Sequence, residues 1–243
     1  MKRQLPLLVG ICACLLIAAG AYVWTSRLMD SVYAYRSLLH AAPPAPGEPL
    51  GAPVTRRVVF VLIDGLRYDT AIDLSVMPTL ARLRTQGCWA RMHSRPMSFS
   101  GSGYTVLLTG AWPEISDGPT FNKTYADLPP FTQDNLFSAA ARSGLKTAVS
   151  GFNWFEKLIF KSDVDATFFT SGEDASADRQ VLDAALPWLA EPGAFQFIMV
   201  HLDQVDYAGH HEGGPSDPQW NAAAHRADDL LAEITSQLDL RQD

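Results

Sequence analysis

The residue best placed for chemistry in this chain is a carboxylate that follows a run of apolar residues. Asp64 comes directly after six apolar residues, 58–63, and Gly65 follows it. An uninterrupted apolar run of this length predicts a strand buried on both faces, with Asp64 at the carboxyl edge of its sheet. A carboxylate there needs a cation, a proton or hydrogen-bond donors. The alternative is that Asp64 caps the following helix.

A second cluster, residues 201–214, follows another apolar run and is dense in carboxylates and imidazoles. Asp206 and His210 are four residues apart, and Gly209 would allow a tight loop between them. Carboxylate oxygen and imidazole nitrogen are usual zinc ligands, so this pair predicts a metal site. The alternative is a polar surface loop. Three more members of the cluster are candidate partners that orient the ligands: His201, Asp203 and His211.

A stretch rich in hydroxyls and glycine supplies a candidate nucleophile. Ser100 stands where residues 98–103 lead into an apolar helix. The amides at a helix N-terminus favour a phosphate, and a serine there can attack phosphorus if a metal lowers the pKa of its hydroxyl. Asn122, further along the chain, could donate its amide to a phosphoryl oxygen. The alternatives are a helix-capping serine and an ordinary turn asparagine.

Strands and helices must alternate from residue 56 onward if these groups are to meet. Strands are predicted over 58–63, 89–93, 146–150 and 195–202. Helices are predicted over 77–86, 103–108, 134–142 and 175–189, followed by one that opens at Asp217-Pro218. This alternation predicts an α/β fold, a mostly parallel sheet covered by helices. The ends of its strands would bring Asp64, Asp206 and His210 around the same hydroxyl.

The N-terminus predicts a membrane anchor. Residues 5–24 carry no charge and match the ~20 residues that a helix needs to cross a bilayer. Lys2 and Arg3 precede them and Arg27 follows, which favours a cytoplasmic N-terminus and an extracytoplasmic domain, periplasmic or luminal. The alternative is a cleaved signal peptide. The predicted division is a signal anchor over 1–27, a juxtamembrane and Pro-rich linker over 28–55, and the α/β domain over 56–243.

Composition sets the remaining bounds. The chain has 243 residues, enough for one α/β domain with a real core. Its net charge of −7, without a cluster of lysine and arginine, argues against a nucleic-acid-binding surface. The three cysteines, Cys12, Cys14 and Cys88, predict no disulfide framework.

Together these stretches resemble the alkaline phosphatase superfamily, and within it the type I phosphodiesterase/nucleotide pyrophosphatase family and the related ethanolamine-phosphate transferases of GPI-anchor synthesis. Asp64 in Ile-Asp-Gly-Leu-Arg resembles the family's first metal-binding aspartate. The interval from Ser100 to Thr109-Gly110 is similar to that from its nucleophile to a Thr-Gly pair. Asn122 resembles its phosphate-contacting asparagine, and Asp206-Tyr207-Ala208-Gly209-His210 resembles its Asp-x-x-Gly-His metal pair. The resemblance runs from about Arg57 to the end.

The resemblance implies a two-zinc mechanism acting on a phosphate ester. Asp64 and the nucleophile would bind one zinc, and Asp206 with His210 the other. Ser100, activated by the metal, would displace the leaving alcohol and form a phospho-enzyme. Water, or an acceptor alcohol in a transferase, would then release the phosphoryl group. Asn122 and the amides near Ser100 would hold the developing negative charge.

Two departures from the family bear on activity. Members often show Thr-Phe-Pro-Asn where this chain has Ser-Gly-Ser-Gly from Ser100, so Ser98 and Ser102 stay alternative nucleophiles. The family completes its two-zinc site with a later Asp-His pair and a distant His, whereas His225 is the only histidine beyond His211. The expectation is a truncated form with an incomplete two-metal site, weak zinc binding and little turnover. The other hypotheses are a catalytically inactive, membrane-tethered binding domain of the same fold and a metal-independent α/β protein.

Overall fold

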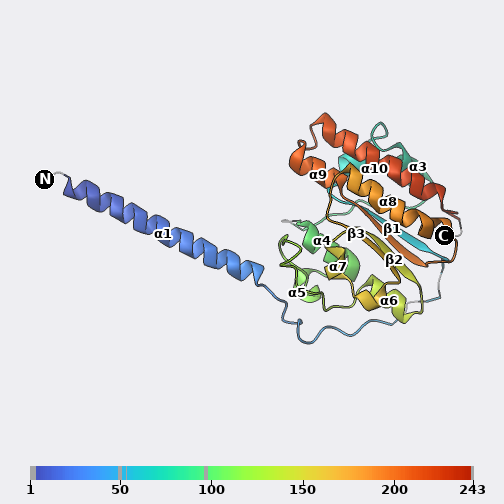
Figure 1. Ribbon diagram of the computed structural model, residues 1–243, viewed down its shortest axis with the longest axis horizontal. Helices are drawn as coiled ribbons and strands as arrows, with labels where there is room; N and C mark the ends of the chain where they lie inside the picture. Colours follow the sequence, from blue (N-terminus) through green and yellow to red (C-terminus); the bar gives the residue numbers. More distant parts are fainter. Residues whose placement is uncertain (1–3, 49–50, 53, 96–97, 242–243) are drawn as a thin grey trace.

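A sheet of four parallel strands forms the centre of the protein. The computed structural model describes residues 4–48, 51–52, 54–95 and 98–241. The strands are β1 (Val58–Ile63), β2 (Thr147–Phe152), β3 (Ala166–Thr170) and β4 (Phe197–Leu202), and their order in the sheet is β1-β4-β2-β3. Helices cover both faces of this sheet (Figure 1). The predicted fold class, a mostly parallel sheet between helices, is confirmed.

Different helices cover the two faces. One layer contains α8 (Ala175–Ala190), α9 (Gln204–His211) and α10 (Pro218–Ser236), with α2 (Tyr68–Ala71) and α3 (Pro78–Gln86) packed against α10. The other layer contains α4 (Ser100–Thr109), α6 (Leu136–Arg142) and α7 (Phe155–Leu158). The short α5 (Pro113–Ser116) packs on α4, and a 3₁₀ turn, η1 (Lys161–Asp163), lies near α6.

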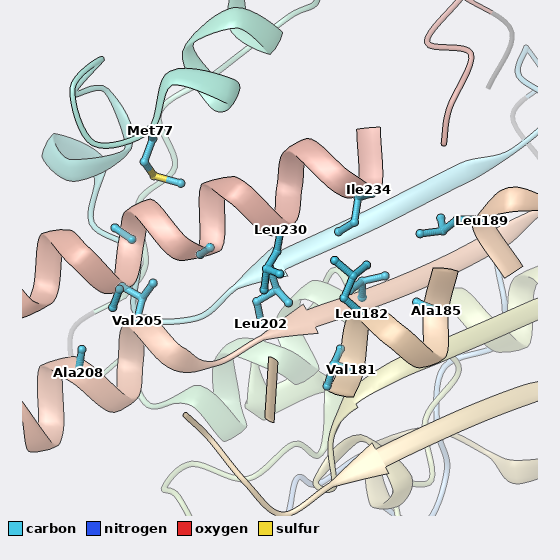
Figure 2. Close-up of a cluster of buried hydrophobic side chains, with 14 of the residues drawn as sticks. Met77, Val181, Leu182, Ala185, Leu189, Leu202, Val205, Ala208, Leu230 and Ile234 are labelled. Atoms are coloured by element: carbon cyan, nitrogen blue, oxygen red, sulfur yellow. The ribbon is translucent and has the colours of Figure 1, made fainter. Parts of the chain in front are cut away.

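Alternation along β4 divides its side chains between the two layers. Ile198, Val200 and Leu202 belong to the core under α8, α9 and α10, and Leu202 lies beside Leu230 in Figure 2. Phe197 and Met199 instead pack in the core under α4, α6 and α7. Because side chains alternate along a strand, His201 faces this second layer.

The helix that opens at Asp217-Pro218 forms as predicted. Asp217 caps α10 by accepting a 2.9 Å hydrogen bond from the Gln219 N–H. The buried carboxylate of Asp228, on the same helix, accepts the N–H groups of Thr79 and Leu80 at 2.7 and 2.9 Å. Since these amides belong to the first turn of α3, a side chain of α10 supplies the N-terminal cap of α3.

The sheet departs from prediction at two strands. The strand predicted over 89–93 is wrong, because residues 88–95 form no regular element and are exposed. Trp89 stacks on the guanidinium of Arg84, 4.5 Å from its ring centre, instead of joining the sheet. The structure adds β3, an edge strand that pairs with β2 and that the sequence pattern did not predict.

A long apolar helix precedes the domain. α1 (Leu5–Tyr33) continues past the predicted anchor boundary at residue 27 and projects from the domain (Figure 1). Within the described residues, Pro6–Tyr33 is the one helix long and apolar enough to cross a membrane, and none of its apolar window is buried. Lys2 and Arg3, on which the predicted orientation depends, lie outside the described residues.

The segment that follows α1 docks onto the domain. We call residues 34–48 the strap. Its Arg36 guanidinium donates to the carboxylate of Asp117, which also accepts the Ser37 N–H at 2.7 Å and contacts His40 Nδ1 at 3.0 Å. Burial opposes ionisation of Asp117, but the hydrogen bonds from Arg36 and Ser37 outweigh burial and lower its pKa. The strap is therefore fixed by an ion pair at the first residues after the helix.

Replacing Asp117 with asparagine should release the strap. Asparagine tolerates the left-handed backbone of this position, where φ is 56°, so the change removes charge with little added strain. Loss of charge-assisted hydrogen bonds should lower the free energy of unfolding by about 1–3 kcal/mol, nearer the lower figure because Arg36 is partly exposed. Faster proteolysis of residues 34–48 would report the release.

The matched control is Asp183→Asn, which removes an ion pair with Arg179 on α8 in which both side chains are more open to solvent. Surface pairs of this kind contribute about 0–1 kcal/mol, so proteolysis of the strap should not change. Equal cleavage rates for the Asp117→Asn and Asp183→Asn proteins would contradict the docking.

Candidate active site

Two distant acids meet where β1 and β4 end. The Asp64 N–H donates to the Leu202 carbonyl at 2.9 Å, so the ladder of the two strands extends to Asp64. Gly65 has a φ of +70°, and a Cβ there would lie 2.7 Å from the Cα of Asp206. The turn after β1 and the first turn of α9 are thus in backbone contact. Asp64 and Asp206 stand at one edge of the sheet. The negative charge of each opposes ionisation of Asp203, which lies nearby, and so raises its pKa.

The pair Asp206 and His210 lies on a helix. The predicted loop is wrong, because residues Gln204–His211 form α9. Helical spacing places the two side chains on one face, with His210 Nε2 at 3.5 Å from Asp206 Oδ2. Gly209 serves close packing instead of a turn, since a Cβ there would lie 2.7 Å from the ring of Trp220 on α10. The His210 side chain is 71% exposed and is free to turn toward a ligand.

Further carboxylates gather at the same edge. Burial raises the pKa of Asp203 to about 9, and the nearby charges of Asp64, Asp206 and Glu173 add to the rise. Burial and Asp64 also raise the pKa of Asp206, although His210 lowers it. Crowding therefore disfavours the ionised form of these carboxylates, and a cation bound between them would stabilise that form. A set of carboxylate oxygens and an imidazole fits zinc or another divalent cation.

Asp64 does not cap a helix. The residue before α2 is Arg67, and no side chain caps that helix. Asp64 instead accepts the Gly65 N–H at its Oδ1, 2.9 Å away, and the Tyr104 hydroxyl at its Oδ2, 2.6 Å away. Ligand atoms of Asp64, His201 and Asp203 lie within 4.8 Å of one another. The hydrogen bond from the Tyr104 hydroxyl to Asp64 therefore links α4 to this acidic edge.

Ser100 is the first residue of α4. It lies one turn before Tyr104, and residues four apart share a helix face. Ser98 and Ser102 instead line a separate cavity of about 320 Å³, together with Tyr35 of the strap and Trp112. The hydroxyl of Ser102 donates back to the Phe99 carbonyl at 3.0 Å. Pro96 and Met97, which precede this stretch, lie outside the described residues.

Asn122 lies against the beginning of α4. Its Oδ1 accepts the Gly101 N–H at 3.0 Å, so one of the amides expected to hold a phosphoryl oxygen is already occupied. This bond fixes the amide plane of Asn122 and leaves Nδ2 to donate elsewhere. The neighbouring Phe121 packs against Phe99, which precedes Ser100, and against Tyr33 at the end of α1, with ring centres 4.7 and 5.9 Å apart.

The structure therefore brings the predicted residues together in two groups. Asp64, Asp206 and His210 form the acidic edge, and Asn122 lies with Ser100 at the beginning of α4. Two neighbours were not predicted. Tyr104 showed no signal in the sequence beyond an apolar helix, and Glu173 follows β3, the strand that the pattern did not indicate.

The fold and this edge define an α/β protein with a parallel sheet between two layers of helices and an acidic cluster at the ends of two of its strands. Residues 58–243 match the type I phosphodiesterase/nucleotide pyrophosphatase family, so the chain belongs to that family. Similar solved structures are phosphonoacetate hydrolase from Sinorhizobium meliloti 1021, with a TM-score of 0.59 and 18% identity, and murine ectonucleotide pyrophosphatase/phosphodiesterase 5, with a TM-score of 0.54 and 16% identity. Each alignment covers 76% of this chain.

The chain is shorter than these relatives. It spans 55% of the phosphonoacetate hydrolase chain and 53% of the murine chain. Among curated proteins, the catalytic subunit of human GPI ethanolamine phosphate transferase 3 is 24% identical in an alignment that is 273 residues long with its gaps. The alignment covers 98% of this chain and 24% of that protein. The similarity thus extends over nearly all of this chain and about a quarter of the transferase.

Proposed function

We propose that this chain is a membrane-anchored, metal-dependent phosphodiesterase or phosphoryl transferase that works through a phosphorylated Ser100. The observation that supports the proposal most is the meeting of Asp64 with Asp206 at one strand edge, opposite the helix that begins with Ser100. Family membership supports the same class of reaction. The substrate would be a phosphate ester, and α1 would hold the domain, over residues 56–243, on the extracytoplasmic side of a membrane.

The proposed roles follow from the donor atoms. Asp64 and Ser100 would hold one zinc ion, and Asp206 with His210 the other. Bound metal supplies Lewis-acid stabilisation and lowers the pKa of the serine hydroxyl. These side chains are fewer than two four-coordinate zinc ions need, so water or further side chains would complete the coordination. Zinc binding by the described residues alone would accordingly be weak.

The reaction would proceed in two displacements. The Ser100 Oγ–phosphorus bond forms while the bond from phosphorus to the leaving alkoxide breaks, and the hydroxyl proton leaves with the alcohol or to solvent. Asn122, whose orientation is fixed by the Gly101 N–H, donates its Nδ2 hydrogen to a phosphoryl oxygen. Water or an acceptor alcohol then attacks phosphorus, and Ser100 regains its proton.

Metal removal tests this proposal. The full-length protein in detergent micelles should hydrolyse bis(p-nitrophenyl) phosphate slowly with zinc, and chelation should lower the rate by about 10²-fold or more. Added zinc should restore it. Asp206→Asn should weaken zinc binding measured by calorimetry, whereas Asp229→Asn, an exposed acid on α10, should not.

Other results would select the other hypotheses. Zinc binding without hydrolysis or phosphorylation of Ser100 would favour the catalytically inactive binding domain of the same fold. An absence of bound zinc, together with wild-type behaviour of Asp206→Asn, would favour the metal-independent α/β protein.

A further inference from the structure

A buried tyrosine connects the acidic edge to the interior of the sheet. Tyr104 is 3% exposed, and its hydroxyl oxygen lies 2.6 Å from Asp64 Oδ2 and 3.0 Å from His201 Nε2. His201 is 1% exposed, and its Nδ1 accepts the Phe152 N–H of β2 at 3.4 Å. Three elements, β2, β4 and α4, therefore contribute to one line of hydrogen bonds that ends on Asp64.

The direction of these hydrogen bonds follows from the Phe152 amide. A backbone N–H can only donate, so His201 Nδ1 must be unprotonated and the ring proton must lie on Nε2. His201 Nε2–H then donates to the Tyr104 oxygen, and the single hydroxyl hydrogen of Tyr104 donates to Asp64. In the opposite tautomer, the proton on Nδ1 would face the Phe152 N–H, so two donors would meet. The single hydroxyl hydrogen of Tyr104 would then have to serve both His201 Nε2 and Asp64. Complete burial lowers the pKa of His201 to about 4, which keeps the ring neutral.

Packing holds both rings in place. The Tyr104 ring stacks on Phe155 with centres 4.7 Å apart, and His201 contacts both rings at 5.1 Å. On the neighbouring strand, Gly151 leaves room for the imidazole, because a Cβ there would lie 2.6 Å from the Cβ of His201. The Tyr104 hydroxyl and the His201 Nε2–H therefore have little freedom to move. The orientation of the Asp64 carboxylate is set by the fixed Tyr104 hydroxyl.

We propose that Tyr104, fixed by His201, is a positioning residue for Asp64. This inference rests on the proposed role of Asp64 as a metal ligand. With Oδ2 held by Tyr104 and Oδ1 by the Gly65 N–H, the carboxylate has one orientation, and its remaining lone pairs are presented to a cation. His201 lies within reach of that cation site, but both of its nitrogens are engaged. It therefore acts through Tyr104 and is not a ligand.

Calorimetric titration of the metal-free, full-length protein with zinc chloride tests the inference without relying on turnover. Tyr104→Phe keeps the ring and removes the hydroxyl, and should weaken zinc binding by about 10- to 100-fold. His201→Leu should weaken it through the same path, whereas His201→Gln, whose amide can still donate to Tyr104, should stay within about 3-fold of wild type. The double variant Tyr104→Phe/His201→Leu should bind zinc no more weakly than Tyr104→Phe alone.

Two results would overturn the inference, and they are distinguishable. Wild-type zinc affinity in Tyr104→Phe, with weakened binding in Asp64→Asn, would overturn the positioning role and leave the proposed function intact. Wild-type affinity in Asp64→Asn would overturn both. If His201→Leu does not fold, the comparison of Tyr104→Phe with His201→Gln decides the question, because equal losses in these two would refute the donor direction.

Discussion

Replacing Ser100 with alanine is expected to lower the hydrolysis rate of the full-length protein by about 10⁴-fold or more. Loss of a nucleophile removes the covalent path, and in other enzymes such losses reach about 10⁶-fold. The residual rate would come from the metal site and from binding. Mass spectrometry after a rapid quench should show a phosphoryl adduct on the peptide containing Ser100 in the wild type, and none in the Ser100→Ala protein.

The controls for this experiment lie in the same stretch. Ser98 and Ser102 line the neighbouring cavity, and Ser102 already donates to the Phe99 carbonyl. Ser98→Ala and Ser102→Ala should each change the rate by less than about 10-fold, with the adduct still on Ser100. A phosphoryl adduct on Ser98, or full activity in Ser100→Ala, would show that the wrong serine has been assigned.

Gly65→Ala should strongly destabilise the acidic edge. The position has a φ of +70°, which costs an alanine about 1–2 kcal/mol. An added Cβ would also lie 2.7 and 2.9 Å from the backbone Cα and N of Asp206, atoms that cannot turn away. We expect the free energy of unfolding to fall by about 3 kcal/mol or more, and zinc affinity to fall as the turn and α9 separate.

Gly144→Ala separates backbone strain from contact. Its φ of +71° nearly equals that of Gly65, but no heavy atom lies within 4 Å of a Cβ there. Denaturant unfolding should therefore show a loss of only about 1–2 kcal/mol, and zinc affinity should not change. Equal losses in the two variants would mean that the approach of the β1 turn to α9 is not a close contact in solution.

Local patterns predicted much of this fold. The apolar runs of β1 and β4 and the Asp217-Pro218 start of α10 are signals carried by neighbouring residues, and all three elements formed. β3 has five residues, and its place at the edge depends on pairing with β2, which no local pattern records. The helix α9 contains a glycine that lowers helix propensity, and contacts from other helices support it there: Trp220 of α10 packs on Gly209, and Asp178 of α8 accepts the N–H groups of Asp203 and Gln204.

The residues of the candidate site likewise divide into those with a local sequence signal and those that only tertiary packing brings to the site. Asp64, Ser100, Asn122, Asp206 and His210 were identified by residue type and order, and their roles stay predictions. Tyr104 could not be identified, because its importance arises only when β1, β4 and α4 are assembled and its hydroxyl meets Asp64 and His201. A helical tyrosine in an apolar stretch is by itself an ordinary core residue.

The row of rings formed by Tyr33, Phe121 and Phe99 has a mechanical consequence. It runs from the last residue of α1 to the residue before Ser100, and Lys123 adds a 2.5 Å hydrogen bond to the Tyr33 carbonyl. If α1 spans a bilayer as proposed, a change in its tilt with bilayer thickness would therefore act on the first turn of α4, which holds the proposed nucleophile. Under the proposed function, the lipid composition of the membrane would then alter the reaction rate, and the protein without α1 would show a different rate.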